Sequence, residues 1–178
     1  GYYSKGPELG ISACLKGFTP EINKTARDLE EKRKVANQRL LERLRREGLN
    51  QMKHTQWFHA EDTFRGMGTK VLGSFCSYLR FQRIVNPSKY LIGFTNMSRE
   101  LPGFGQLDKE FVKVSSRAPD LLGKMIEGGK KPPLSKVLPE ACALYGGFGD
   151  GHSVAASGIL PVGVEEKFMQ TLEKLVSK

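Results

Sequence analysis

The sequence predicts an α/β fold, in which a mixed sheet flanked by helices follows a long connector helix. After residue 50, short apolar stretches alternate with helical ones, an alternation typical of layered α/β folds. Before residue 50, a long charged stretch carries apolar residues at three- and four-residue steps, the period of an amphipathic helix. We therefore expect an N-terminal segment with a basic connector helix over residues 1–50 and an α/β domain over residues 51–178.

The connector helix has recognisable ends. Thr19 can cap it, Pro20 suits its first position and Gly48 suits its stop. Its apolar stripe consists of Ile22, Ala26, Leu29, Ala36, Leu40 and Leu44. Four arginines gather in its last third: Arg39, Arg43, Arg45 and Arg46. A single stripe on a charged helix is typical of a connector that lies across a neighbouring layer, although a coiled-coil partner could use the same stripe.

The α/β domain reads as a series of short elements. Apolar stretches predict strands at 55–59, 90–94, 111–115 and 153–160. Periodic apolar residues predict helices at 67–82, 119–127 and 134–144, and a final helix marked by Val164, Phe168, Leu172 and Leu175. A glycine-rich segment, 146–151, lies between the predicted helix 134–144 and the predicted strand 153–160.

The charge is concentrated at one end of the chain. Of the formal +9, residues 1–89 hold 17 Lys and Arg against 9 acids, whereas residues 90–178 hold 11 against 10. Such a surplus favours a polyanionic partner, because Lys and Arg that neutralise phosphates release condensed counterions. A solvated basic surface that serves solubility is the other interpretation.

The cysteines and the apolar runs bear on the compartment. Cys14, Cys76 and Cys142 are scattered and suggest neither a disulfide framework nor a zinc ribbon, so we expect small buried residues in a reducing cytoplasm. No apolar run approaches the roughly 20 residues needed to cross a bilayer, and we expect a soluble protein without membrane association. The first residue is not Met, which suggests processing or excision from a longer polypeptide.

The glycine-rich segment is the strongest local signal for chemistry. Its small residues and histidine are Gly146, Gly147, Gly149, Gly151, His152, Ala155 and Ala156. Such a segment can turn backbone N–H groups outward to bind an anion, or it can be a tight connecting loop. Asp150 weighs against a phosphate cradle, because a carboxylate repels phosphate. His152 could contact a phosphate, orient a metal-bound water or cap the loop.

A second signal is the arginine that follows the predicted strand 111–115. Arg117 could clamp a phosphate with two hydrogen bonds, or it could pair with Asp120 at the surface. His54 and His59 lie five residues apart, so on a strand they face opposite sides and predict no shared metal site.

In order along the chain, these segments resemble the second half of archaeal RecJ-like exonucleases of the DHH phosphoesterase superfamily. The resemblance runs through 17–23, the connector helix, Gln56-Trp57-Phe58-His59 and Gly66-Met67-Gly68-Thr69. It continues through Lys113-Val114-Ser115-Ser116-Arg117, the block 146–156 and Ile159-Leu160-Pro161-Val162-Gly163.

In that family, a first domain holds an Asp-His-His motif and further acids, which bind two divalent metals and activate water. A second, DHH-associated domain grips the nucleic acid. The resemblance implies that Ser116, Arg117, Gly146, Gly147 and His152 hold single-stranded DNA or RNA. The composition of the glycine-rich segment and of the connector helix adds Gly149, Ala155, Arg43 and Arg46.

The sequence contains no Asp-His-His triplet. We therefore expect no catalytic residue, metal or cofactor in this chain, and Mn or Mg only in an N-terminal DHH domain of the parent protein. Two departures from the family pattern matter: Asp150 replaces a further glycine, and Ser157 replaces the glycine that follows the paired alanines. Both favour a degenerate, scaffold-like relative, such as the archaeal counterpart of the cell-division-cycle subunit of the eukaryotic replicative helicase, which binds the GINS complex.

Three functional hypotheses follow. The first is the single-strand-binding domain of an exonuclease in DNA replication or repair. The second is a replisome module that docks on GINS. The third is the substrate-binding half of a phosphodiesterase acting on dinucleotides or oligoribonucleotides.

Overall fold

The computed structural model describes residues 2–101 and 105–177. Over these residues the chain forms six helices and two sheets. The helices are α1 (Tyr2–Lys16), α2 (Pro20–Glu47), α3 (Lys70–Leu79), α4 (Asp120–Glu127), α5 (Leu134–Ala143) and α6 (Glu165–Val176). The strands are β1 (Asn50–Gln51), β2 (Thr55–His59), β3 (Tyr90–Asn96), β4 (Glu100–Leu101), β5 (Gly105–Gln106), β6 (Phe111–Arg117), β7 (Phe148–His152) and β8 (Ala155–Pro161). The predicted α/β class with a preceding long helix is confirmed.

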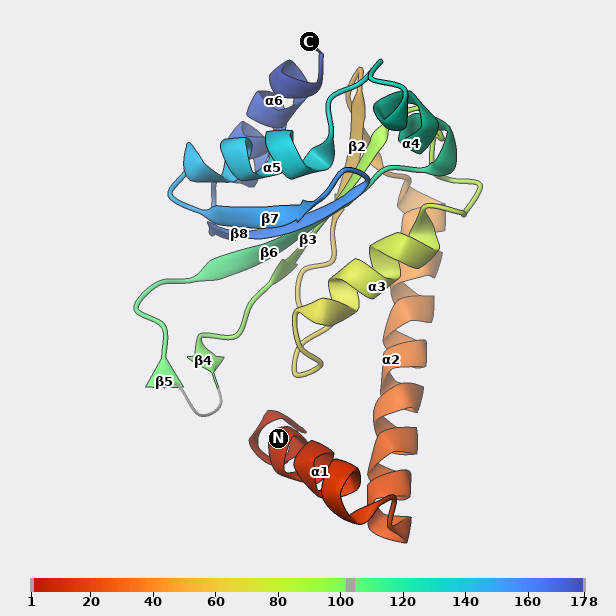
Figure 1. Cartoon of the computed structure of the whole chain (residues 1–178), viewed down its shortest axis with the longest axis vertical. Coiled ribbons are helices and arrows are strands. Elements are labelled where there is room, and N and C mark those ends of the chain that lie inside the picture. The colour runs from red at the N-terminus through yellow and green to blue at the C-terminus, as the bar shows by residue number, and fades with distance from the viewer. Residues whose placement is uncertain (1, 102–104, 178) are drawn as a thin grey trace.

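The main sheet has six strands in the order β1-β2-β3-β6-β8-β7, and β4 and β5 pair separately. It is a mixed sheet because β2 and β3 run parallel while the other neighbouring pairs run antiparallel. Figure 1 shows α5 and α6 on one side of β6, β8 and β7, and α3 on the other side.

The connector helix α2 begins and ends where its capping residues predict. The Thr19 hydroxyl accepts a hydrogen bond from the Ile22 N–H at 3.2 Å, which satisfies one of the free donors of the first turn. Gly48 has φ 80°, and its N–H donates to the Leu44 carbonyl at 2.8 Å.

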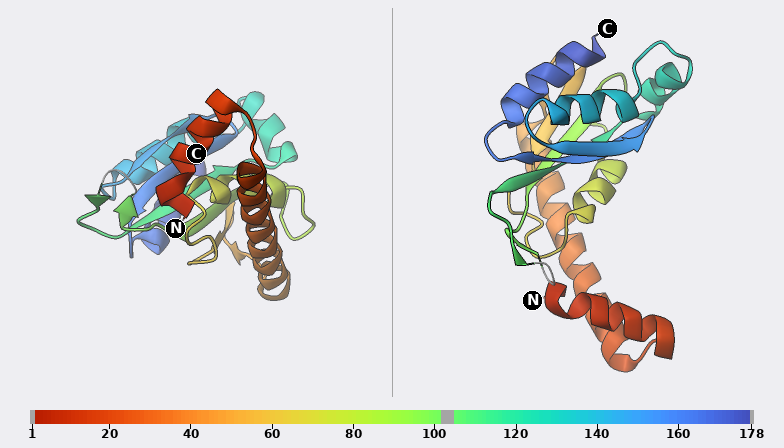
Figure 2. Two further views of the ribbon diagram at one scale, coloured as in Figure 1. Left: turned by 90° about the horizontal axis from the view of Figure 1, so that it is seen from below. Right: turned by 60° about the vertical axis from the view of Figure 1, so that its left-hand side comes forward.

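The stripe on α2 is buried mainly in the C-terminal half of the helix. Its buried residues are Ile22, Ala36, Leu40, Leu41 and Leu44. Ala26, which we expected in the stripe, is exposed, and Leu29 is half-buried. Figure 2 shows why: α1 and the N-terminal part of α2 form an arm that extends away from the sheet.

The two sides of the sheet carry separate apolar cores. The larger core lies under α4, α5 and α6 and includes Ile92, Val114, Leu122, Leu138, Leu160 and Phe168. The smaller core lies between the sheet, α2 and α3 and includes Leu40, Leu44, Phe58, Leu72, Phe75 and Leu91. Alternation along β3 explains the division, because Leu91 and Ile92 point to opposite sides.

The elements of the structure differ from the predicted elements in three places. Helix α1 was not predicted, because Gly6, Pro7 and Gly10 are poor helix formers. The predicted helix 67–82 is shorter and begins at Lys70, since Gly66 and Gly68 have positive φ. The glycine-rich segment is not only a loop: Phe148–His152 is the edge strand β7, paired with β8.

The cysteine and membrane expectations can also be compared with the structure. Cys76 and Cys142 are buried as expected, but Cys14 is exposed. Burial raises the pKa of both buried thiols to about 12, so they stay protonated at neutral pH. In the part of the chain that the structure describes, no helix combines the length and apolar character that a membrane span requires.

Candidate nucleic-acid interface

One side of β6, β8 and β7 is left partly open, because α3 lies mainly against β3 and β6. The residues that point to this side follow from strand alternation and from the register of the three strands. We call them the open face: Lys113, Arg117, Phe148, Asp150, His152, Ala155, Ser157 and Ile159. The three residues on β7 are exposed and the others are half-buried.

Arg117 and His152 lie in one row across the open face. The register pairs Arg117 with Ala155 and Ala155 with His152. Directly paired residues point to the same side of a sheet, and two strand spacings separate the outer pair by about 10 Å. The small Ala155 side chain between them leaves room for a ligand that crosses β8.

The Arg117 guanidinium is fixed by α3. Its Nε donates to the Ser77 hydroxyl at 2.9 Å, its Nη2 to the Gly73 carbonyl at 3.0 Å, and its Nη1 to the Ser116 carbonyl at 2.8 Å. Burial lowers the pKa of Arg117 from its ordinary value, but an arginine remains charged in a protein. None of the ion pairs among the described residues joins Arg117 to Asp120. Arg117 is therefore a positioned cation at the border of the open face.

Lys113 is a second cation on this face, and it was not among the residues predicted from the sequence. Its Nζ donates to the Ser157 hydroxyl on β8 at 3.2 Å. Burial lowers the pKa of Lys113 from its ordinary value. Strand alternation from Arg117 would have identified it, since residues 113 and 117 of one strand share a side.

The glycines of the segment serve the packing of α5. A Cβ atom on Gly149 would lie 3.2 Å from the Cys142 sulfur and 3.2 Å from a Leu138 methyl, both on α5. A Cβ on Gly158 would lie 2.8 Å from the same sulfur. Gly147 is similarly enclosed, and only Gly146, with φ 71°, has open space around it and needs glycine for the turn. A Cβ on Gly147 or Gly151 would first meet β8, at the Ile159 carbonyl oxygen and at Ala156 respectively. Close approach of α5 and of the neighbouring strand therefore accounts for most of the small residues.

Asp150 is exposed between His152 and Phe148 on β7. Its carboxylate accepts a hydrogen bond from the Gly151 N–H at 2.7 Å. The side chain therefore stays on the open face, where its negative charge repels phosphate from the middle of β7.

Ser116 lies on the other side of the sheet from Arg117. It pairs with Ile92 and Ala156, which belong to the core under α5, and it is fully buried. Its hydroxyl has no hydrogen-bond partner among the described residues. The structure does not bring Ser116 and Arg117 to one site, because neighbouring residues of a strand point to opposite sides.

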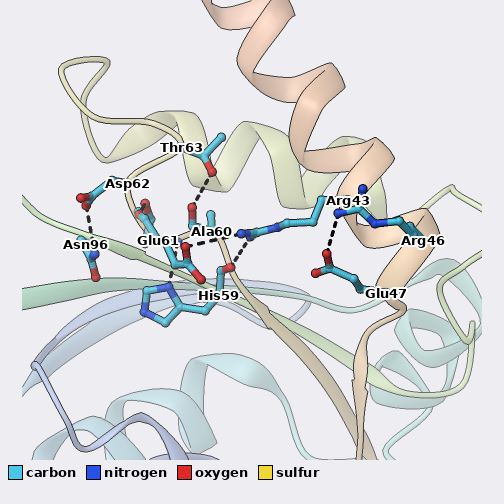
Figure 3. A network of polar contacts seen from close by, with 10 residues as sticks. Arg43, Arg46, Glu47, His59, Ala60, Glu61, Asp62, Thr63 and Asn96 are labelled. Atoms are coloured by element: carbon cyan, nitrogen blue, oxygen red, sulfur yellow. Dashed lines mark hydrogen bonds and ion pairs between the residues drawn. The ribbon is translucent and has the colours of Figure 1, made fainter.

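Arg43 and Arg46 lie on α2, apart from the open face. The Arg43 Nη2 donates to the His59 carbonyl at 2.6 Å, and its Nη1 lies 3.6 Å from a Glu61 carboxylate oxygen (Figure 3). Arg46 pairs with the adjacent Glu47 at 2.8 Å (Figure 3). Arg43 thus fastens α2 to the end of β2, while Arg46 is an exposed cation on the connector.

The histidines do not form a metal site. His59 Nδ1 accepts a hydrogen bond from the Glu61 N–H at 2.8 Å, and its Nε2 lies 3.8 Å from a Glu165 oxygen. Burial lowers the pKa of His59, against the opposing effect of the Glu165 carboxylate. In the described ranges, no three His, Cys, Asp or Glu side chains gather closely enough to hold a metal ion.

Comparison with known proteins gives structural similarity alone. No protein-family model matches the sequence, and no curated protein matches it. The fold resembles the C-Ala domain of Aquifex aeolicus alanyl-tRNA synthetase, with a TM-score of 0.50 and 11% identity over 73% of this chain and 98% of that domain.

Two further solved structures are similar at lower scores. A DHH domain from a member of the s1p family of ribosomal proteins has a TM-score of 0.46 and 14% identity, over 86% of this chain and 32% of the other. A pGpG-specific phosphodiesterase from Vibrio cholerae has a TM-score of 0.41 and 12% identity, over 88% of this chain and 42% of the other. This chain therefore spans less than half of those two proteins, and it shares the fold of the C-Ala domain.

Proposed function

We propose that the open face binds the phosphate backbone of single-stranded nucleic acid, as the substrate-holding domain of a RecJ-like DHH-superfamily protein in DNA replication or repair. The observation that carries this proposal is the row formed by Arg117, Ala155 and His152. A guanidinium positioned by α3 and an exposed imidazole flank a small residue on the partly open side of the sheet. Arginine and histidine donate hydrogen bonds to phosphate oxygens, and the small residue between them admits the backbone.

Charge supports the same partner. Lys113 and Arg117 lie on the open face, and the whole chain has a formal charge of +9. The long-range attraction of a basic protein raises the rate of encounter with nucleic acid, and the face itself then supplies the contacts. Cleavage would require metal-binding acids from another part of the parent protein, such as the N-terminal DHH domain expected from the family resemblance.

Salt titration of the intact chain tests the proposal. Binding of a fluorescent single-stranded oligonucleotide should weaken between about 50 and about 200 mM salt, with a slope of about −0.7 for each phosphate contact. Arg117→Gln, which retains a donor for the Gly73 carbonyl, and Lys113→Gln should each reduce that slope by one contact. Each should weaken binding about tenfold, as expected for one charge-assisted hydrogen bond.

Lys136→Gln is the matched control. Lys136 is exposed on α5, which covers the other side of the sheet, so its loss removes one charge without touching the open face. It should change the affinity by much less than Lys113→Gln. If Arg117→Ala combined with His152→Ala leaves the binding of single strands unchanged, the proposed site is wrong.

A protein partner is the second candidate, because the arm carries exposed apolar side chains. Ile11 and Leu15 on α1 and Phe18 before α2 are 61%, 78% and 73% exposed. Isolated exposed apolar residues are common, but three of them on one projecting arm fit a docking module such as one for the GINS complex. Co-purification with GINS after nuclease treatment, lost in Leu15→Asp, would support it.

A further inference from the structure

We propose that Phe148 is a stacking platform for an unpaired nucleobase, and that it makes the open face select single-stranded over double-stranded nucleic acid. The inference rests on the proposed nucleic-acid-binding function and specifies which form of nucleic acid the face accepts. It comes from the position of Phe148 on β7, a strand that the glycine-rich sequence did not predict.

Phe148 projects from the sheet without a covering helix. Its side chain is 70% exposed, although it begins a strand whose next residue, Gly149, packs under α5. Burying a phenylalanine stabilises a fold, and the fold forgoes this gain at Phe148. The exposed ring is therefore available to a partner.

The neighbours of Phe148 on the sheet suit a nucleobase. The register pairs Phe148 with Ile159, and Ile159 with Lys113, so an aromatic, an aliphatic and a cationic side chain form a second row. An aromatic ring stacks on the face of any base, and a nearby cation contacts the attached backbone.

Charge separates this row from the Arg117–Ala155–His152 row. Asp150 lies between Phe148 and His152 on β7, and four residues of strand place these two about 13 Å apart. A carboxylate repels phosphate, so the backbone is kept off the middle of β7 and can lie along the cations Arg117 and Lys113 of β6. The open face thus offers cations to the phosphates and an exposed ring to a base.

The two aromatic residues of β2, Trp57 and Phe58, are held in packing contacts. Trp57 packs edge-on against Phe94 at 5.9 Å between ring centres, and Phe58 packs against Phe75 at 5.7 Å. Both are held in the two apolar cores. A base in a duplex is already stacked and paired, so a single exposed ring selects strands whose bases are free.

Three probes of equal length test the inference on the intact chain: a mixed-sequence single strand, a fully abasic single strand and a duplex. Phe148→Ala should weaken binding of the mixed-sequence strand by about 5- to 150-fold, the range for loss of one base–aromatic stack. Binding of the abasic strand, and the salt slope, should not change. The matched control is Phe81→Ala, which removes a phenylalanine that is 61% exposed after α3, outside the open face, and should have no effect.

Phe148→Trp provides a spectroscopic readout and a rescue. An indole stacks at least as well as a phenyl ring, so binding of the mixed-sequence strand should be retained. The fluorescence of the introduced indole should be quenched by that strand and not by the abasic strand. Wild-type emission from Trp57, the one tryptophan of the sequence, gives the baseline.

The outcomes separate this inference from the proposed function. If the wild type binds none of the three probes, the proposed function itself is wrong. If it binds the mixed-sequence and abasic strands equally well and Phe148→Ala changes neither, the face binds backbone and the stacking inference is overturned. An equal loss for both strands in Phe148→Ala also overturns it, because the ring would then act through the structure of β7. Retained binding of nucleic acid by Phe148→Ala together with loss of a bound protein would assign the ring to a protein partner.

Discussion

The two sides of β8 differ in what they contact, although their residues alternate along one strand. Ala156, Gly158 and Leu160 face α5 and are buried. Ala155, Ser157 and Ile159 face the opposite side and are half-buried. We call the first side, covered by α4, α5 and α6, the closed face. The residues on one side of β8 pack against α5, and the residues on the other side can contact a ligand.

This difference divides the glycine-rich segment between two tasks. Gly149 and Gly158 face α5 and allow it to approach the sheet, whereas Phe148 and His152 project to the open face. A motif of glycines followed by a histidine therefore need not be a single anion-binding loop. Here the glycines position the strand, and the residues between them face the ligand.

The largest expected difference in stability between the closed and the open face comes from replacing one phenylalanine on each face with alanine. Phe168 on α6 is fully buried in the closed-face core, in edge contact with Phe94 at 5.9 Å. Phe168→Ala should lower the free energy of unfolding by about 3–5 kcal/mol, because it leaves a cavity in a packed core. The same substitution at the exposed Phe148 should change it by less than about 0.5 kcal/mol. Urea unfolding monitored by circular dichroism measures both.

A loss in Phe148→Ala as large as that in Phe168→Ala would break the comparison. It would mean that the ring on the open face stabilises the fold through contacts of its own. The exposed fraction of Phe148 argues against this result.

A smaller difference in the free energy of unfolding is expected between substitutions at two adjacent residues of β8. A Cβ on Gly158 would lie 2.8 Å from the Cys142 sulfur and 2.5 Å from the Phe148 carbonyl oxygen. Gly158→Ala should therefore cost about 1–3 kcal/mol, since backbone or helix must shift. Ser157→Ala, one residue earlier on the open face, removes only the acceptor of the Lys113 hydrogen bond and should cost less, about 0.5–1 kcal/mol. Thermal and urea unfolding of the two variants would show the contrast, and equal losses would mean that α5 does not pack as closely as described.

Local signals explain which elements could be predicted. The ends of α2 follow from Thr19, Pro20 and Gly48, whose capping effects depend only on the nearest turn. β-Branched and aromatic residues identified β2, β3 and β6. β7 could not be found in this way, because its glycines disfavour a strand and its pairing with β8 supplies the conformation. Helix α1 was missed for the similar reason that Gly6, Pro7 and Gly10 lie within it.

Only some members of the candidate site could be selected from the sequence, and their arrangement could not. Arg117 and His152 were selected from the sequence, yet their common row depends on the strand order β6-β8-β7, which is a tertiary property. Strand alternation alone should have separated Ser116 from Arg117 and added Lys113. Whether these residues contact phosphate stays a prediction.

The smallest expected effect concerns a titrating residue at the end of the closed face. His59 stacks on Phe94, and its Nδ1 accepts a hydrogen bond from the Glu61 N–H, which requires that this nitrogen be unprotonated. Burial lowers the pKa of His59 below its ordinary value of 6.5. Below that ordinary value the unfolded chain binds more protons than the folded chain, so falling pH favours unfolding.

His59 therefore stabilises the fold above its ordinary pKa, and this stabilisation is lost as the pH falls through its lowered pKa. The free energy of unfolding of the wild type and of His59→Gln should be compared from about pH 8 to about pH 5. All other residues are the same in both proteins, so the difference between them reports on position 59. The stability advantage of the wild type should shrink as the pH falls. An advantage that grows toward acid would mean that the Glu165 carboxylate, 3.8 Å from Nε2, outweighs burial and favours the protonated ring.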